Sequence, residues 1–112
     1  MSKSRSLAIG VASIALFGCG SAHHESGTER HLPEAGRQVF IRAGCGGCHT
    51  LNAAGSKGTV GPNLDNVAGA LTLAFVVHQV QIGGGPMPAF KTKLTAKQIQ
   101  AVSQYVLSNA GK

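Results

Sequence analysis

Two cysteines and a histidine stand together near the middle of this chain, in the sequence Cys45-Gly46-Gly47-Cys48-His49. Two thiols three residues apart can lie along one helical turn, and an imidazole follows directly. Thiols at this spacing can reach the two vinyl groups of one porphyrin, and the imidazole nitrogen can then lie under its iron. Because Gly46 and Gly47 have no side chains, the backbone can approach a flat ring closely. The motif predicts covalent haem attachment through Cys45 and Cys48, with His49 as an axial ligand.

Three other uses of the motif were weighed. A thioredoxin-like redox pair needs a βαβ context, and the sequence has no such strand pattern. A zinc site needs a fourth ligand and usually a second pair of ligands, which the sequence does not offer at a suitable spacing. A Cys45–Cys48 disulfide would leave His49 without a role. A chain of 112 residues without tryptophan is also short of apolar bulk, so a covalent cofactor would help to stabilise it.

Met87 is the candidate for the sixth iron ligand. It is the only methionine besides Met1, and Pro86 and Pro88 flank it. The prolines restrict the backbone, so little entropy would be lost in holding the thioether at the iron. The alternative is a methionine that fills a gap in the core. His78 is a weaker candidate, because helical periodicity predicts that it faces solvent, away from the apolar side of its helix.

Three stretches show helical periodicity, joined by irregular loops. The first is predicted to begin at Pro33, the second covers residues 73–80 and ends before Gly83, and the third begins at Thr95 with a capping-box pattern. No stretch alternates long enough to predict a strand. The fold class is therefore all-α, within one domain of residues 33–112. The candidate apolar residues around the haem are Leu64, Val76, Val80, Phe90, Ile99 and Val102.

The order of these features is similar to that of a known family. The chain has a helix, the Cys45–His49 motif, Gly61-Pro62-Asn63-Leu64, a helix, Met87 and a last helix. Residues 33–112 thereby resemble class I cytochromes c, especially the small bacterial and c6-like members. The resemblance implies three main helices and irregular loops wrapped around one covalent haem c.

The same resemblance implies two details of the structure. The carbonyl of Pro62 would accept a hydrogen bond from His49 and orient its ring, although a simple turn proline is the alternative. The first and last helices would cross closely, with Gly36 and Phe40 packed against Tyr105.

A class I cytochrome c carries single electrons and is not an enzyme. With both axial positions filled, no catalytic residue and no open site for a substrate are expected. Two alternatives remain at the level of the sequence. One is a haem enzyme or gas-binding sensor with an open sixth position, and the other is a fixed haem subunit of a respiratory complex.

The N-terminus predicts export. Residues 1–18 have a basic start and a short apolar run, which is typical of a signal peptide and too short to span a bilayer. The residues around Cys19 resemble the lipobox of bacterial lipoproteins, so we expect lipidation of Cys19, with cleavage after Ala22 as the alternative. Residues 19–32 are predicted to be a flexible tether. The protein would then lie at the periplasmic or extracytoplasmic face of a bacterial membrane.

The net charge is +6, and removal of the signal peptide takes away Lys3 and Arg5. No block of basic residues indicates nucleic-acid binding. The expected partners are redox proteins, and we expect a monomer. Lys91, Lys93 and Lys97 follow the Met87 segment and could border the exposed haem edge, where they would steer acidic docking surfaces. A solvated face without this role is the alternative.

Overall fold

The structure is a computed structural model that describes residue 10, residues 26–67 and residues 69–112. The predicted signal peptide of residues 1–18, apart from Gly10, lies outside these residues, as do Cys19 and the alternative cleavage site after Ala22. The described chain is mainly helical, which confirms the predicted all-α class. Its helices are α1 Ser26–Arg42, α2 Leu73–Ile82 and α3 Ala96–Asn109. The loops between them contain three 3₁₀ turns, which are η1 Cys45–Gly47, η2 Asn52–Ala54 and η3 Leu64–Asn66. They also contain two short strands, β1 Thr50–Leu51 and β2 Ser56–Lys57.

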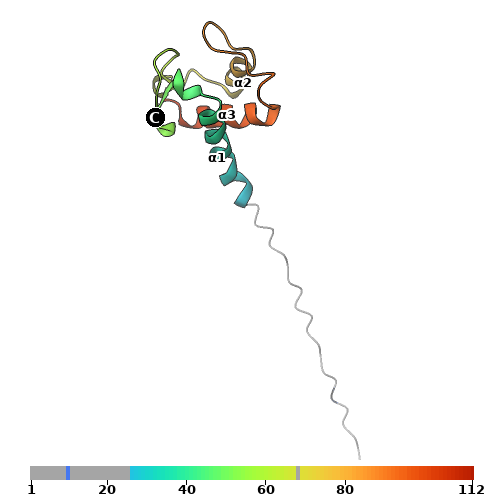
Figure 1. Cartoon of the computed structure of the whole chain (residues 1–112). Helices are drawn as coiled ribbons and strands as arrows, with labels where there is room; N and C mark the ends of the chain where they lie inside the picture. The colour runs from blue at the N-terminus through green and yellow to red at the C-terminus, as the bar shows by residue number, and fades with distance from the viewer. Residues whose placement is uncertain (1–9, 11–25, 68) are drawn as a thin grey trace, which may run out of the picture.

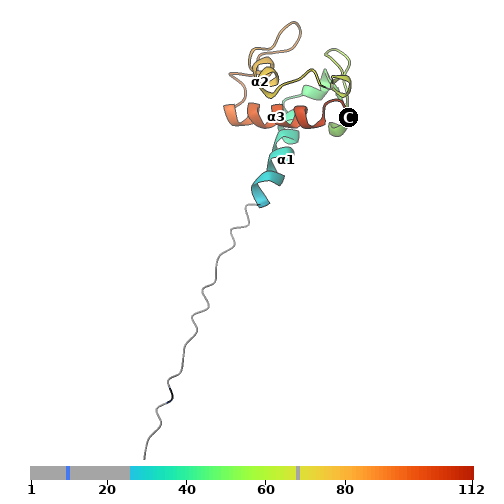
Figure 2. The ribbon, with the colours of Figure 1, turned by 180° about the vertical axis from the view of Figure 1, so that it is seen from behind.

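The crossing of α1 and α3 forms the scaffold. In Figures 1 and 2, α3 runs across α1, and α2 lies along the other side of α3. A side chain at Gly36 would collide with the backbone of Ala101 and with Tyr105, so glycine is what permits the close approach. The rings of Phe40 and Tyr105 then meet edge to face, with centroids 6.0 Å apart and planes inclined by 62°. The crossing expected from the family resemblance is present.

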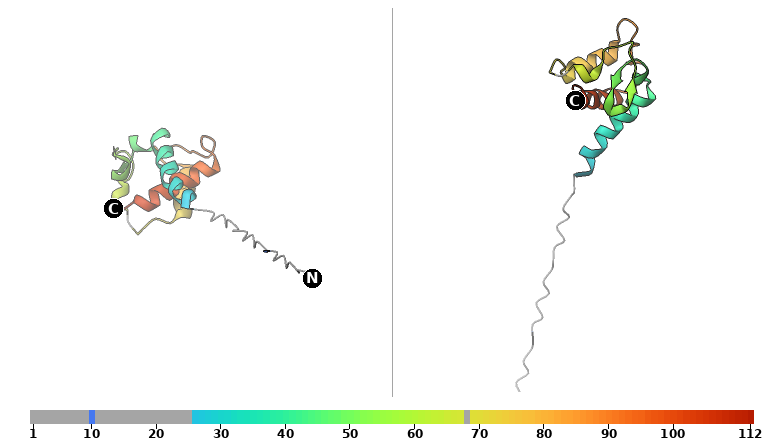
Figure 3. Two further views of the ribbon diagram at one scale, coloured as in Figure 1. Left: turned by 90° about the horizontal axis from the view of Figure 1, so that it is seen from below. Right: turned by 90° about the vertical axis from the view of Figure 1, so that its left-hand side faces the viewer.

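α1 begins at Ser26, earlier than the start predicted at Pro33. The prediction of a flexible tether is therefore wrong for residues 26–32, which are helical. Pro33 lies inside α1 and is exposed to solvent, so the backbone carbonyl that loses its N–H partner there can bind water instead. The N-terminal part of α1 projects beyond the body formed by the other helices (Figures 1 and 3).

The starts of the other two helices follow the sequence closely. The Thr72 hydroxyl accepts a hydrogen bond from the Phe75 amide at 3.2 Å and caps α2. Before α3, Thr95 and Gln98 form the predicted capping box, each side chain accepting a hydrogen bond from the other residue's amide. α2 ends at Ile82, and Gly83, which follows it, has a φ of +67° that suits glycine.

A short hairpin, which the sequence analysis did not predict, follows the Cys45–His49 motif. β1 and β2 pair antiparallel with Thr50 opposite Lys57, and each strand has only two residues, too few to show alternation (Figure 3, right). The Ser56 hydroxyl donates a hydrogen bond to the His49 carbonyl at 2.9 Å, and the Thr50 hydroxyl donates to the Gly58 carbonyl at 2.8 Å. These bonds fix the backbone on the C-terminal side of His49.

Gly36→Ala tests the crossing of α1 and α3. The added methyl group has no room, so we expect the free energy of unfolding to fall by about 1–3 kcal/mol despite the better helix propensity of alanine. Thermal and chemical denaturation of the haem-loaded protein would measure this loss. Ala35→Ser is the control, because it adds one atom at the exposed position of α1 that precedes Gly36. Equal stability of the two variants would show that the close approach is not needed.

Candidate haem-binding site

A cavity of about 500 Å³ lies between α2, α3 and the loops that follow α1. Its walls are almost entirely apolar, and all three helices and the loops between them contribute to them. The apolar side chains that line it are Phe40, Val60, Pro62, Leu64, Val67, Leu71, Phe75, Val76, Val80, Pro86, Met87, Val102 and Val106. Such a volume with apolar walls suits a large flat apolar ligand.

The motif residues lie at one wall of this cavity. Cys45, Cys48 and His49 all line it, and η1 holds them in a tight turn in which the His49 amide donates to the Cys45 carbonyl at 2.9 Å. Cys45 and Cys48 do not form a disulfide with each other. In the chain before haem attachment, burial raises the pKa of the Cys45 thiol.

The imidazole of His49 is held from two sides. Its Nδ1 lies 2.8 Å from the carbonyl oxygen of Pro62, and since a carbonyl can only accept, Nδ1 donates. Gly61 lies against the ring, and a Cβ added at Gly61 would lie 2.6 Å from Cε1 of His49. The hydrogen bond assigns the proton to Nδ1 and leaves Nε2 as the nitrogen available to a metal.

Met87 reaches the same cavity from a loop held by backbone hydrogen bonds. The amides and carbonyls of Gly84 and Met87 bond reciprocally, both at 3.0 Å, and close a two-residue turn. The Phe90 amide donates to the Val80 carbonyl at 3.0 Å, so the chain beyond Met87 returns to the end of α2. The loop therefore presents Met87 to the cavity in a defined conformation.

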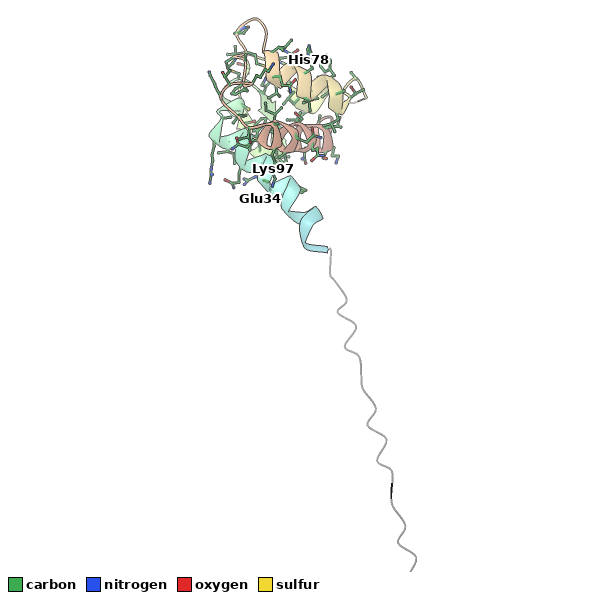
Figure 4. All side chains as sticks on the ribbon, turned by 90° about the vertical axis from the view of Figure 1, so that its right-hand side faces the viewer. Glu34, His78 and Lys97 are labelled. Atoms are coloured by element: carbon green, nitrogen blue, oxygen red, sulfur yellow. The ribbon has the colours of Figure 1, made fainter. Side chains whose placement is uncertain are left out.

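His78 is exposed on the outer face of α2, as predicted, and does not line the cavity (Figure 4). None of Lys91, Lys93 and Lys97 lines the cavity either. Lys97 lies on the opposite side of the molecule from His78 in Figure 4. The ammonium of Lys93 lies 5.8 Å from the centre of the Phe90 ring, in a second cleft between α1 and the segment before α3.

The expected cavity wall is correct for four residues and wrong for two. Phe90 and Ile99 are buried but do not line the cavity. Phe90 lies in the loop between α2 and α3 and lines the second cleft instead. Ile99 lies on α3, where helical periodicity gives the face of a residue and not its height along the axis. The sequence analysis missed several lining residues, which are Phe40, Val60, Val67, Leu71, Phe75, Gln79 and Val106. Gln79 donates from Nε2 to the Gly83 carbonyl at 2.9 Å, and its position three residues after Val76, on the same face of α2, was the signal available.

Comparisons with known proteins find cytochromes, which agrees with a haem-binding site in this cavity. A family model described as cytochrome c oxidase, cbb3-type, subunit III matches residues 31–106. Cytochrome c6 of Leptolyngbya boryana is 41% identical over 80 residues, which are 70% of this chain and 93% of that protein. Chloroplastic cytochrome c6 of Chlamydomonas reinhardtii is 35% identical over 83 residues, which are 67% of this chain and 53% of that protein. The solved c-type cytochrome SorU from Sinorhizobium meliloti matches with a TM-score of 0.67 and 40% identity, over 74% of this chain and 95% of that chain.

The chain belongs to the class I cytochrome c family. The cofactor of this cytochrome is therefore a covalently bound haem c, and the Cys45–His49 motif is the one that such a cofactor requires. The structure fits this group, because apolar walls surround a cavity that has two thiols and an oriented imidazole at one side. Within the described part of this cytochrome, no three His, Cys, Asp or Glu side chains gather closely enough to hold a metal ion by themselves.

Gly61→Ala tests the packing against His49 in this cytochrome. The added Cβ would push the imidazole away from Pro62, so we expect the free energy of unfolding to fall by about 1–3 kcal/mol. We also expect the NMR signal of the Nδ1 proton to shift or to exchange faster with water. Pro62→Ala keeps the carbonyl acceptor and is the control, with an expected loss of about 1 kcal/mol or less. An unchanged Nδ1 proton in Gly61→Ala would contradict this account.

Proposed function

We propose that this cytochrome carries single electrons between redox proteins through one haem c held by Cys45, Cys48, His49 and Met87. The supporting observation is that all four side chains line one apolar cavity, although Met87 belongs to a loop far along the chain from the other three. Two thiols beside a histidine, facing a thioether, form the donor set that suits a covalent haem with two axial ligands.

Each residue then has a defined part. Cys45 and Cys48 form the thioether bonds, and His49 binds iron through Nε2. The hydrogen bond from Nδ1 to the Pro62 carbonyl fixes the ring plane and makes the imidazole a stronger donor. Met87 provides a soft neutral ligand, which raises the reduction potential. When bound, haem c supplies an iron that alternates between Fe(II) and Fe(III).

The rest of the cavity supports electron transfer and not catalysis. With both axial ligands supplied by the chain, no position remains for a substrate, so we infer that the protein is not an enzyme. Apolar walls exclude water and limit solvent rearrangement when the iron changes charge. A peroxidase or a gas sensor would need an open iron position, and rapid, tight binding of carbon monoxide by the reduced protein would favour that alternative.

Met87→Ala should remove the sixth ligand. We expect the ferric protein to lose its weak near-infrared band and the reduced protein to bind carbon monoxide rapidly. We expect the reduction potential to fall by on the order of 100 mV, since axial ligands set potentials over about 0.8 V. Val60→Ala, which shortens another side chain of the same cavity, should keep the near-infrared band. Met87→Ala spectra identical to those of the wild type would exclude Met87 as the ligand.

A fixed subunit of a respiratory complex is the second candidate. The matching family model is described as an oxidase subunit, and that observation favours it. The matched relatives named cytochrome c6 favour the separate carrier, since this chain covers 93% of one of them. Purification after mild detergent extraction discriminates the two, because a fixed subunit would remain with large partner chains and a separate carrier would not.

We further propose that the cytochrome is exported and attached to the extracytoplasmic face of a membrane by lipid on Cys19. A basic start and a short apolar run precede a cysteine at the position where lipoproteins carry theirs. No helix in the described residues is long and apolar enough to cross a membrane. The alternative of cleavage after Ala22 would leave a chain without an anchor.

Cys19→Ala should separate these two forms. We expect the wild-type cytochrome in the membrane fraction, with a mass that includes acyl chains and one haem. The variant should move to the soluble fraction with its haem and its spectra unchanged, because Cys19 lies outside the haem-binding domain. A wild-type mature chain that begins at His23 and carries no acyl group would overturn the lipid anchor.

A further inference from the structure

Two chain segments lie side by side at the candidate axial histidine. Residues 48–52, which we call the histidine segment, contain His49, and residues 61–65, which we call the proline segment, contain Pro62. The hydrogen bond from His49 Nδ1 to the Pro62 carbonyl joins the two segments at 2.8 Å. Any group that holds the segments together therefore also controls the length and strength of this bond.

Two further hydrogen bonds join the histidine segment to the proline segment. The Gly61 amide donates to the Cys48 carbonyl at 2.8 Å. The Asn52 amide donates to the Asp65 carboxylate, at 3.0 Å to Oδ1 and 3.2 Å to Oδ2. The partners in all three bonds are 13 residues apart in the sequence, so the two segments run in the same direction.

Pro62 depends on these neighbouring bonds for its position. A proline has no N–H group, so Pro62 cannot be anchored through an amide of its own. Its carbonyl is located instead by the bonds on either side of it, which are the Gly61 amide bond before it and the Asp65 carboxylate bond after it. The bond at Asp65 is the one of these two that a side chain provides.

Asp65 is itself held in place on the proline segment. Its amide donates to Asn63 Oδ1 at 2.9 Å, which caps η3, and the carbonyl of the neighbouring Leu64 accepts a hydrogen bond from the Gly111 amide at 3.0 Å. The Asp65 side chain is half-buried, and it is the only carboxylate side chain of the sequence after Glu34. A carboxylate is a stronger acceptor than a neutral oxygen, so it suits a bond that must keep two segments together.

We propose that Asp65 is a positioning residue for the haem iron, which acts by holding the proline segment against the histidine segment and so strengthens the bond from His49 to Pro62. The proposal rests on the function proposed above, because it needs iron at His49 Nε2. A stronger bond at Nδ1 makes the imidazole a stronger donor, which favours Fe(III). Asp65 therefore lowers the reduction potential although it is not a ligand.

Asp65→Ala in the haem-loaded protein tests the proposal with two measurements. The first is the rate at which the His49 Nδ1 proton of the reduced protein exchanges with deuterated water, followed by NMR. We expect exchange to be about threefold faster or more, because loss of the Asn52 bond favours local opening of the two segments. The second is the reduction potential, which should rise because the imidazole becomes a weaker donor.

Asp65→Asn separates position from charge. Its Oδ1 can still accept from the Asn52 amide, whereas the negative charge is removed. We expect the Nδ1 proton to exchange within about twofold of the wild-type rate, and the potential to lie between those of the wild type and Asp65→Ala. If Asp65→Asn and Asp65→Ala have the same potential and both exchange at the wild-type rate, the carboxylate acts through its charge alone and the proposal fails.

Asn52→Pro removes the donor of the same bond and keeps the Asp65 charge. Leu51 is extended, with φ −148° and ψ 107°, which is the conformation favoured before a proline. We expect faster Nδ1 exchange and a higher potential, as in Asp65→Ala. The double variant should exchange no faster than the faster single variant, since one bond can be lost only once. Fully additive effects would contradict the proposal.

Glu34→Ala is the matched control. It removes the same charge as Asp65→Ala, but Glu34 bonds within α1, to Gln38 at 2.7 Å and to Arg37 at 3.7 Å. The Nδ1 exchange rate should stay within about twofold of the wild type, and acceleration equal to that of Asp65→Ala would overturn the proposal. Failure of the proposed function is distinct, since a wild-type protein without covalent haem, or with no bond from His49 to iron, would contradict that function before any variant is compared.

Discussion

The hydrogen bond from His49 Nδ1 to the Pro62 carbonyl is the interaction on which the site depends. It assigns the ring proton, and Gly61 leaves just enough space for the imidazole to lie flat against the backbone. The His49 backbone is fixed in turn by the Ser56 hydroxyl at its carbonyl and by the Cys45 carbonyl at its amide. A side chain held at its ring and at both sides of its backbone keeps one orientation, as the proposed role of His49 requires.

The crossing of α1 and α3 supports the site, whereas the loops contain His49 and Met87. Gly36 and the Phe40–Tyr105 contact join the two helices into a support, and Phe40 also reaches the cavity wall. α2 packs on α3 and carries the Met87 loop at its C-terminal end. The two candidate axial residues therefore lie on separate segments that are positioned by one shared helix pair, so loss of the crossing would change the separation of His49 and Met87.

Much of this could be predicted from the sequence because the signals were local. The starts of α2 and α3 follow from Thr72 and Thr95, whose hydroxyls bond to amides three residues ahead. The start of α1 could not be predicted, because the rule that places proline in the first turn fails where an exposed carbonyl can bind water. Periodicity gave the faces of α2 and α3 but not which turns reach the cavity, so Ile99 was assigned to it wrongly. The two-residue strands beside His49 are fixed by side-chain hydrogen bonds between loops, for which a single sequence has no pattern.

The loop of Met87 is fastened mostly by main-chain bonds, between Gly84 and Met87 and between Phe90 and the end of α2, together with the bond from the Gln79 side chain to the Gly83 carbonyl. Such bonds do not depend on which side chains the loop displays, provided that its glycines and prolines are kept. The identity of Ile82 or Ala89 can therefore vary during evolution, or be chosen in engineering, without displacing the sulfur. The side chains that this loop displays can thus change without changing how the loop holds Met87 at the cavity.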